Sequence, residues 1–115
     1  IVKSKMKTSY FSKSGHLEKV VSIARGVPIG WKGRQYLNLA PPWELINQYK
    51  TDKNESLYIN HYKHLVLDKL NPEKVYNELG DDAILLCWEK SNTFCHRYIV
   101  AEWFYKNLQI EVEEL

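Results

Sequence analysis

The densest group of chemically capable side chains lies in the segment from Cys87 to Arg97. It holds two thiols, a carboxylate, an imidazole and a guanidinium, at Cys87, Glu89, Cys95, His96 and Arg97. A thiolate is a nucleophile, an imidazole transfers protons near neutral pH, and a guanidinium holds an anionic group. We therefore predict that an active or binding site is built around this segment.

Within the segment, Cys95 is the candidate nucleophile. We place it in the first turn of a helix capped by Ser91, Asn92 or Thr93, where backbone N–H groups and the helix dipole favour a thiolate. His96 is then the candidate acid/base. Cys95 could equally be a packed thiol, and His96 could simply bind a loop carbonyl.

Glu89 and Cys87 complete the expected cluster. Glu89 could orient His96, act as an alternative base, or pair with Arg97 or Arg25 in a structural ion-pair network. Cys87 lies within an apolar run and is expected to belong to the core.

The cysteine count also bears on compartment and metal binding. Two cysteines without a secretory signal predict free thiols and a cytoplasmic protein. Cys87, Cys95 and His96 are zinc-compatible types, but their spacing matches no C-x-x-C or H-x-x-x-H pattern, and the adjacent Cys95 and His96 would rarely both reach one ion. We expect no metal and no other cofactor. No phosphate-binding loop is expected either, because strand–helix context is lacking around Gly26, Gly30 and Gly33.

Length and composition indicate one globular domain spanning residues 1–115. Hydrophobic residues make up 44% and charged residues 26%, which does not indicate disorder. The net charge is +2, but residues 1–50 carry +7 and residues 51–115 carry −5. The basic half could face an anionic ligand, or the halves could neutralise one another in the fold. No apolar run is long enough to span a membrane.

The elements that must position these side chains alternate between strands and helices. Hydrophobic patterning predicts a first strand whose end lies at residues 8–11, and further strands over residues 19–24, 83–88 and 110–114. It predicts helices over residues 42–49, 54–69, 72–79 and 94–107, the third capped by Asn71 and ended by Gly80. Residues 26–41 are expected to form a long loop.

This alternation predicts an α/β fold, with a small, mostly parallel sheet of about four strands flanked by helices in a single layered domain. Parallel sheets bind ligands at the carboxyl ends of their strands. Here those ends lie near Ser12, Arg25 and Glu89.

Several short motifs occur together along the chain. They are Thr8–Phe11, Ser22–Gly26, Leu39–Trp43 with Tyr62, Leu85–Glu89, Cys95–Arg97 and Ile110–Val112. With these motifs, above all C-x-E followed by C-H-R, the chain resembles the short members of the DUF488 family (domain of unknown function 488). The resemblance implies an α/β sandwich-like fold and the convergence of Arg25, Cys87, Glu89, Cys95, His96 and Arg97. It supplies no substrate.

Three hypotheses about function follow. The first is a small enzyme acting on an anionic, nucleotide- or nucleic-acid-like substrate, with Cys95, His96 and Glu89 as catalytic residues. Arg25, Arg97, Ser9 and Tyr10 would bind that substrate. The second is a non-catalytic module that binds nucleic acid or another ligand through basic and aromatic side chains, at Lys3, Lys5, Lys7, Lys13, Lys32 and Arg34 with Tyr10, Phe11, Trp31 and Tyr36. The third is a purely structural cluster. No membrane partner is expected, and the sequence does not indicate an oligomeric state.

Overall fold

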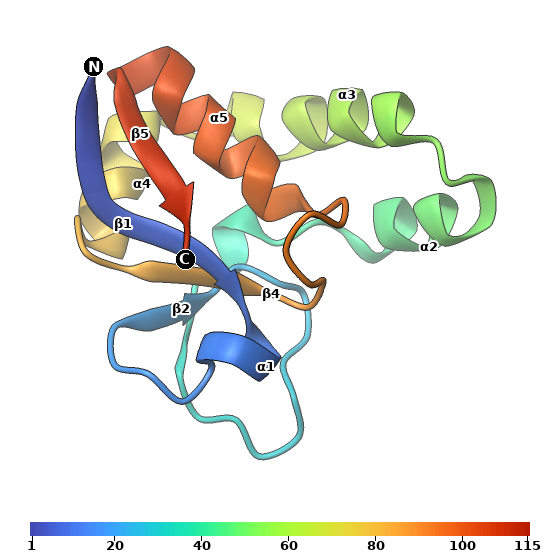
Figure 1. Cartoon of the computed structure of the whole chain (residues 1–115). Helices are drawn as coiled ribbons and strands as arrows, with labels where there is room; N and C mark the ends of the chain where they lie inside the picture. The colour runs from blue at the N-terminus through green and yellow to red at the C-terminus, as the bar shows by residue number, and fades with distance from the viewer.

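Five parallel strands form the centre of the computed structural model, which describes residues 1–115 (Figure 1). The sheet has the order β3-β2-β4-β1-β5, and every strand pairing is parallel. The strands are β1 (Val2–Tyr10), β2 (Val20–Ser22), β3 (Arg34–Gln35), β4 (Ile84–Cys87) and β5 (Ile110–Glu114). The predicted α/β class with a parallel sheet and flanking helices is confirmed, with five strands in place of about four.

The differences from prediction concern β1 and β3. β1 begins at Val2, because residues 2–7 alternate lysines with Val2, Ser4 and Met6, and the last two of these are buried. β3 lies inside the predicted loop 26–41 and pairs with β2 over only two residues. So short a strand has no hydrophobic pattern of its own, and it forms because β2 offers an unpaired edge.

Five α-helices connect or cover the strands. They are α1 (Phe11–Ser14), α2 (Trp43–Asp52), α3 (Glu55–Leu65), α4 (Pro72–Leu79) and α5 (His96–Leu108). The caps predicted for α4 are confirmed: the Asn71 side chain accepts a hydrogen bond from the Lys74 amide, and Gly80 ends the helix at φ +97°. The helix predicted over 54–69 ends at Leu65, and a 3-10 turn follows at Leu67–Lys69.

The two faces of the sheet are covered unequally. The larger core cluster joins Leu85 of β4 to side chains from α3, α4 and α5. A smaller cluster joins its neighbour Leu86, which points to the opposite face, to Phe11 of α1 and to the partly buried Trp31. Figure 1 shows α5 on one side of β1 and β4 and α1 on the other.

The register brings the carboxyl ends of three neighbouring strands together. Tyr10 of β1 lies opposite Cys87 of β4, and Ser22 of β2 lies opposite Leu86. The segment that follows β4 returns at this edge and begins α5 there. The sequence-predicted site therefore lies at the edge where parallel sheets present ligands. None of the helices has the length and apolar character needed to cross a membrane.

Candidate functional site

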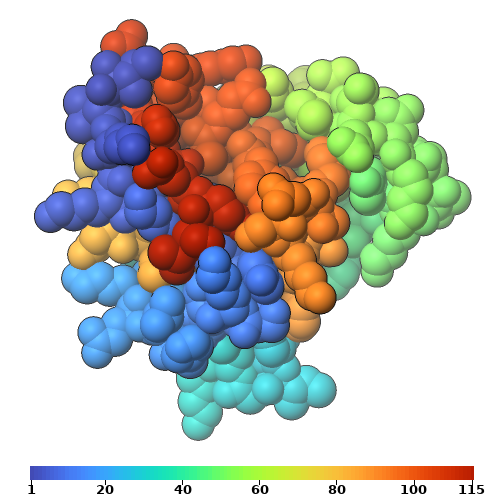
Figure 2. All heavy atoms as spheres, in the orientation of Figure 1, coloured from blue at the N-terminus to red at the C-terminus, as the bar shows by residue number.

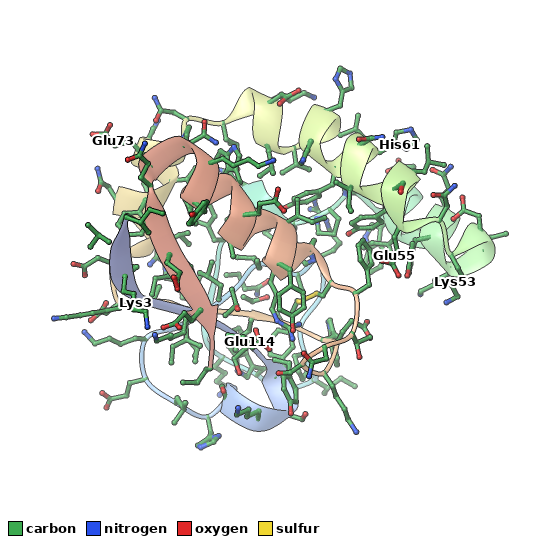
Figure 3. The ribbon with its side chains drawn as sticks, turned by 45° about the horizontal axis from the view of Figure 1, so that its top comes forward. Lys3, Lys53, Glu55, His61, Glu73 and Glu114 are labelled. Atoms are coloured by element: carbon green, nitrogen blue, oxygen red, sulfur yellow. A yellow bond between two sulfur atoms is a disulfide. The ribbon has the colours of Figure 1, made fainter.

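Cys87 and Cys95 are joined by a disulfide, drawn as the yellow bond in Figure 3. Cys87 ends β4 and Cys95 directly precedes α5, so the loop 88–94 closes a small ring between strand and helix. Both residues are buried, which confirms Cys87 as part of the core. The prediction of two free thiols is wrong in this structure. The spacing of the cysteines gives no indication of the pairing, because the path of the loop decides it.

Cys95 caps α5 and does not lie within its first turn. Its backbone is extended (φ −155°, ψ 149°), and no side chain caps the helix, so the predicted caps at Ser91, Asn92 or Thr93 are wrong. Ser91 donates instead to Glu114, at 2.5 Å. The sulfur of Cys95 still adjoins the helix N-terminus, where the helix dipole favours negative charge.

His96 is buried beside the disulfide, and its hydrogen bonds determine which ring nitrogen carries the proton. Nε2 lies 2.7 Å from the carbonyl oxygen of Ile23, directly after β2. Because a carbonyl only accepts, Nε2 is the protonated nitrogen. Burial lowers the pKa of His96 to about 4, so the ring is neutral at pH 7. The unprotonated Nδ1 then faces Sγ of Cys95 at 3.7 Å.

Arg97 is fully buried and belongs to a closed polar network. Its Nη2 lies 2.8 Å from Oε2 of Glu114, its Nε donates to Oε1 of the same carboxylate, and Nη1 donates to Sγ of Cys87 at 3.0 Å. Tyr98 adds a hydroxyl acceptor and a ring face to the guanidinium. In Figure 2 the end of β5 (red) lies at the surface between the blue N-terminal region and the orange segment around the start of α5.

Glu114 is the carboxylate that balances Arg97. Burial alone would raise the pKa of its carboxyl, but hydrogen bonds from Arg97, Ser91 and Thr8, with the charge of Arg97, lower that pKa to about 2. The sequence-based pairing of Glu89 with Arg97 or Arg25 is therefore wrong. Glu89 is exposed and forms no ion pair or hydrogen bond with either arginine or with His96.

Arg25 lies two residues beyond the carbonyl that binds His96. Its Nε and Nη2 each donate to a backbone carbonyl, of Pro41 and Ala40, at 3.1 Å. No carboxylate pairs with Arg25, so its positive charge is not neutralised by an ion pair. Unlike Arg97, Arg25 therefore keeps an uncompensated charge near the carboxyl end of β2.

The remaining predicted binding residues, Ser9 and Tyr10, end β1 beside the last residues of β4. Ser9 is fully buried, and its hydroxyl lies 2.5 Å from that of Ser14. Tyr10 is half-buried, with its ring centre 5.8 Å from the guanidinium carbon of Arg97. Both interact within the chain, and their role in binding a substrate stays a prediction.

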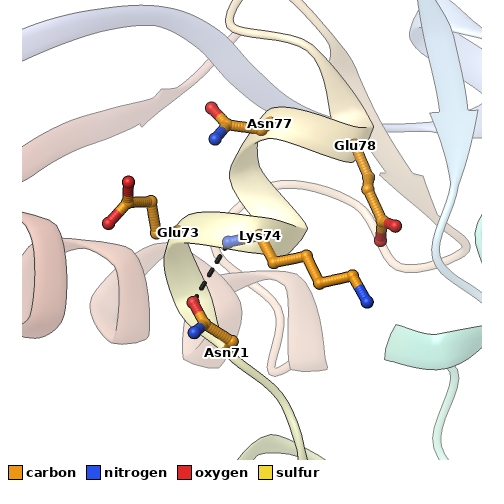
Figure 4. A pocket seen from close by; sticks show the side chains of 5 residues that line it. All are labelled: Asn71, Glu73, Lys74, Asn77 and Glu78. Atoms are coloured by element: carbon orange, nitrogen blue, oxygen red, sulfur yellow. Dashed lines mark hydrogen bonds between the residues drawn. The ribbon is translucent and has the colours of Figure 1, made fainter.

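Several members of the predicted basic surface also have partners within the chain. Lys3 and Lys7 lie 3.6 and 3.3 Å from the carboxylate of Glu113. Arg34 donates to the backbone carbonyls of Glu78 and Leu79. An open depression on α4 is lined only by polar residues, Asn71, Glu73, Lys74, Asn77 and Glu78 (Figure 4), and includes none of the candidate site residues.

The structure thus brings four of the predicted residues together, Cys87, Cys95, His96 and Arg97, and adds Glu114, which the sequence analysis missed. The only available signal was the alternating pattern of residues 110–114, which places Glu114 in a strand but names no neighbour. An α/β domain with a Cys–His–Arg cluster at the carboxyl edge of a parallel sheet defines the class of protein. The chain belongs to the DUF488 family: the model of its active DUF488-N3 subclade (DUF488-N3a) matches residues 12–108, which confirms the resemblance. No curated protein and no solved structure matches the chain.

Proposed function

We propose that the protein is a small thiol enzyme that acts on an anionic substrate, with the reduced Cys95 as nucleophile and His96 as the group that accepts its proton. The carrying observation is the unprotonated Nδ1 of His96, 3.7 Å from Sγ of Cys95. Pairing a thiol with a base that a third group holds in place is the usual way to activate a nucleophile. The Ile23 carbonyl is that third group here, and membership of a subclade described as active agrees with the proposal.

The chemistry begins from the dithiol, since a disulfide sulfur has no proton to lose. Once an external dithiol has reduced the bond, Sγ of Cys95 passes its proton to Nδ1 of His96 and attacks an electrophilic atom of the substrate. The electron pair of the broken bond leaves with the departing group, which takes the proton back from His96. Water then cleaves the bond between the substrate and Cys95 and restores the thiol.

The anionic character of the substrate is supported by Arg25. Its charge has no ion-pair partner, while Arg97 already donates to Glu114, Cys87 and Tyr98. A phosphate or carboxylate near the carboxyl end of β2 would be attracted to Arg25. A nucleotide or nucleic-acid phosphate is the form of this anion that we favour.

Alkylation kinetics test the proposal without a known substrate. The protein is reduced, any bound metal is removed with a chelator, and iodoacetamide is then added over a range of pH. Mass spectrometry identifies the modified cysteine. Cys95 should react faster than Cys87, and His96→Gln should slow Cys95 by about tenfold or more, in line with the loss of a positioned base. Inorganic phosphate and a nucleoside monophosphate should change the Cys95 rate in the wild type and in Arg34→Gln but not in Arg25→Gln.

Arg34→Gln is the matched control, because Arg34 also donates to two backbone carbonyls but lies away from the sulfurs. Equal Cys95 rates in the wild type and His96→Gln would overturn the nucleophile–base assignment. An anion effect that survives in Arg25→Gln would overturn the role given to Arg25.

A further inference from the structure

We propose that, when the disulfide is reduced, Cys87, Cys95 and His96 form a zinc-binding site that competes with the thiol chemistry of Cys95. The inference rests on the same reduced cysteine pair as the proposed function. It assigns that pair a ligand, Zn²⁺, and a second state in which Cys95 is a metal ligand and not a nucleophile.

The donor geometry is the first support. The two sulfurs and a ring nitrogen of His96 all lie within 4.8 Å of one another, and all three residues are buried. Around a tetrahedral zinc with Zn–S near 2.3 Å and Zn–N near 2.0 Å, neighbouring donor atoms lie roughly 3.5–3.8 Å apart. Sγ of Cys95 and Nδ1 of His96 are already 3.7 Å apart. Adjacent cysteine and histidine residues rarely both reach one ion, but the donor atoms of Cys95 and His96 lie close enough together to do so.

Room for an ion appears only after reduction. The Cα atoms of Cys87 and Cys95 lie 7.4 Å apart, which is wider than the roughly 4.4–6.8 Å usual for a disulfide. Once the bond is reduced, the two sulfurs can therefore move apart to the spacing of two zinc ligands. Oxidation consumes both thiolates and removes two of the three ligands. Zinc binding should therefore be confined to the reduced protein.

The groups behind the ligands are the second support. A metal-bound histidine usually donates its other ring N–H to a carbonyl or carboxylate, and His96 donates Nε2–H to the carbonyl of Ile23. Arg97 donates to Sγ of Cys87, which is the contact expected of a hydrogen bond to a metal-bound thiolate.

Charge balance agrees with a divalent ion. Arg97 is neutralised by Glu114, so two buried thiolates would otherwise carry two uncompensated negative charges. One Zn²⁺ cancels both. Three protein ligands leave a fourth position for water or for an anionic group.

Competition with a zinc indicator tests the site directly. The protein is reduced with a phosphine, freed of metal by a chelator, and titrated with Zn²⁺ without oxygen. We expect about one zinc per reduced wild-type chain and none for the disulfide form. Cys87→Ser, Cys95→Ser and His96→Gln should each weaken binding at least about tenfold, which is the lower limit for losing even an outer partner. His64→Gln, a change at an exposed histidine, should leave it unchanged.

The comparison of oxidised and reduced wild type needs no variant, so a variant that fails to fold does not obscure the result. No zinc uptake by the reduced wild type, or equal uptake by the disulfide form, would overturn the site. Iodoacetamide supplies the second measurement, since bound zinc should slow alkylation of Cys95. If zinc fails to bind while His96 still accelerates alkylation, only the zinc site is wrong. If zinc binds while alkylation in its absence ignores His96, only the enzyme proposal is wrong.

Discussion

Acid should destabilise the disulfide-bonded protein through His96. A free imidazole has a pKa of 6.5, whereas that of buried His96 is about 4. Between these values the unfolded chain binds a proton that the folded protein does not accept, so stability falls as the pH falls. The contribution is complete above pH 6.5 and is lost as the pH falls through 4. Each tenfold difference in proton affinity corresponds to about 1.4 kcal/mol, so the whole effect is about 3 kcal/mol.

Urea unfolding followed by tryptophan fluorescence measures this loss. The oxidised, zinc-free wild type is compared with oxidised His96→Gln at about pH 7, 6, 5 and 4, the window set by the two pKa values. Glutamine keeps an amide N–H for the Ile23 carbonyl but does not titrate, so acidic groups elsewhere affect both proteins alike. The stability advantage of the wild type should shrink by about 3 kcal/mol from pH 7 to pH 4.

Two results would refute the reasoning. One is a stability difference between wild type and His96→Gln that stays constant across this range. The other is a proton titration of the His96 ring, followed by NMR, with a midpoint near that of a free imidazole. Either would mean that the ring is hydrated or charged in the fold, contrary to its burial and its hydrogen bond to Ile23.

Three further predictions concern stability. Glu114→Gln should lower the free energy of unfolding at pH 7, measured with urea, by about 3 kcal/mol, because it leaves buried Arg97 without its carboxylate. The variant should also lose the acid sensitivity that the wild type shows between about pH 4.5 and 2, where protonation of Glu114 removes stability. A wild-type-like acid profile would contradict the pairing. Gly33→Ala should cost about 1–3 kcal/mol and shift the fluorescence of Trp31, since a Cβ would lie 2.2 Å from that ring; unchanged thermal unfolding would refute the contact. Asn71→Ala should cost about 1 kcal/mol in the same assay through loss of the α4 cap, and no loss would show that the cap contributes nothing.

Local patterns predicted several elements correctly. The apolar run at 83–88 became β4, which pairs with β1 and β2 on its two sides. Asn71, Pro72 and Gly80 placed α4, because caps and turn residues act on their immediate neighbours. The helix predicted over 94–107 was observed as His96–Leu108. Such signals lie within a few residues of the element that they determine, so one sequence suffices to find them.

Elements that depend on distant partners were predicted less well. β3 exists only through its pairing with β2, and the partner of Arg97 comes from the last strand of the chain. Glu89 lies closer to Arg97 in the sequence than Glu114 does, yet Glu114 is the carboxylate that pairs with Arg97. Sequence distance is a poor guide here, because parallel pairing places Glu114 opposite Thr8, next to the network.

The sequence by itself determined the α/β class, the family and the segment that holds the Cys–His–Arg cluster, because residue type and local periodicity carry that information. Only the tertiary structure decided the disulfide between Cys87 and Cys95, the protonated nitrogen of His96 and the partner of Arg97. Each of these depends on a contact made when separate strands meet at one edge of the sheet. Ile23 orients His96, and Glu114 neutralises Arg97; no spacing within Cys87–Arg97 contains either fact.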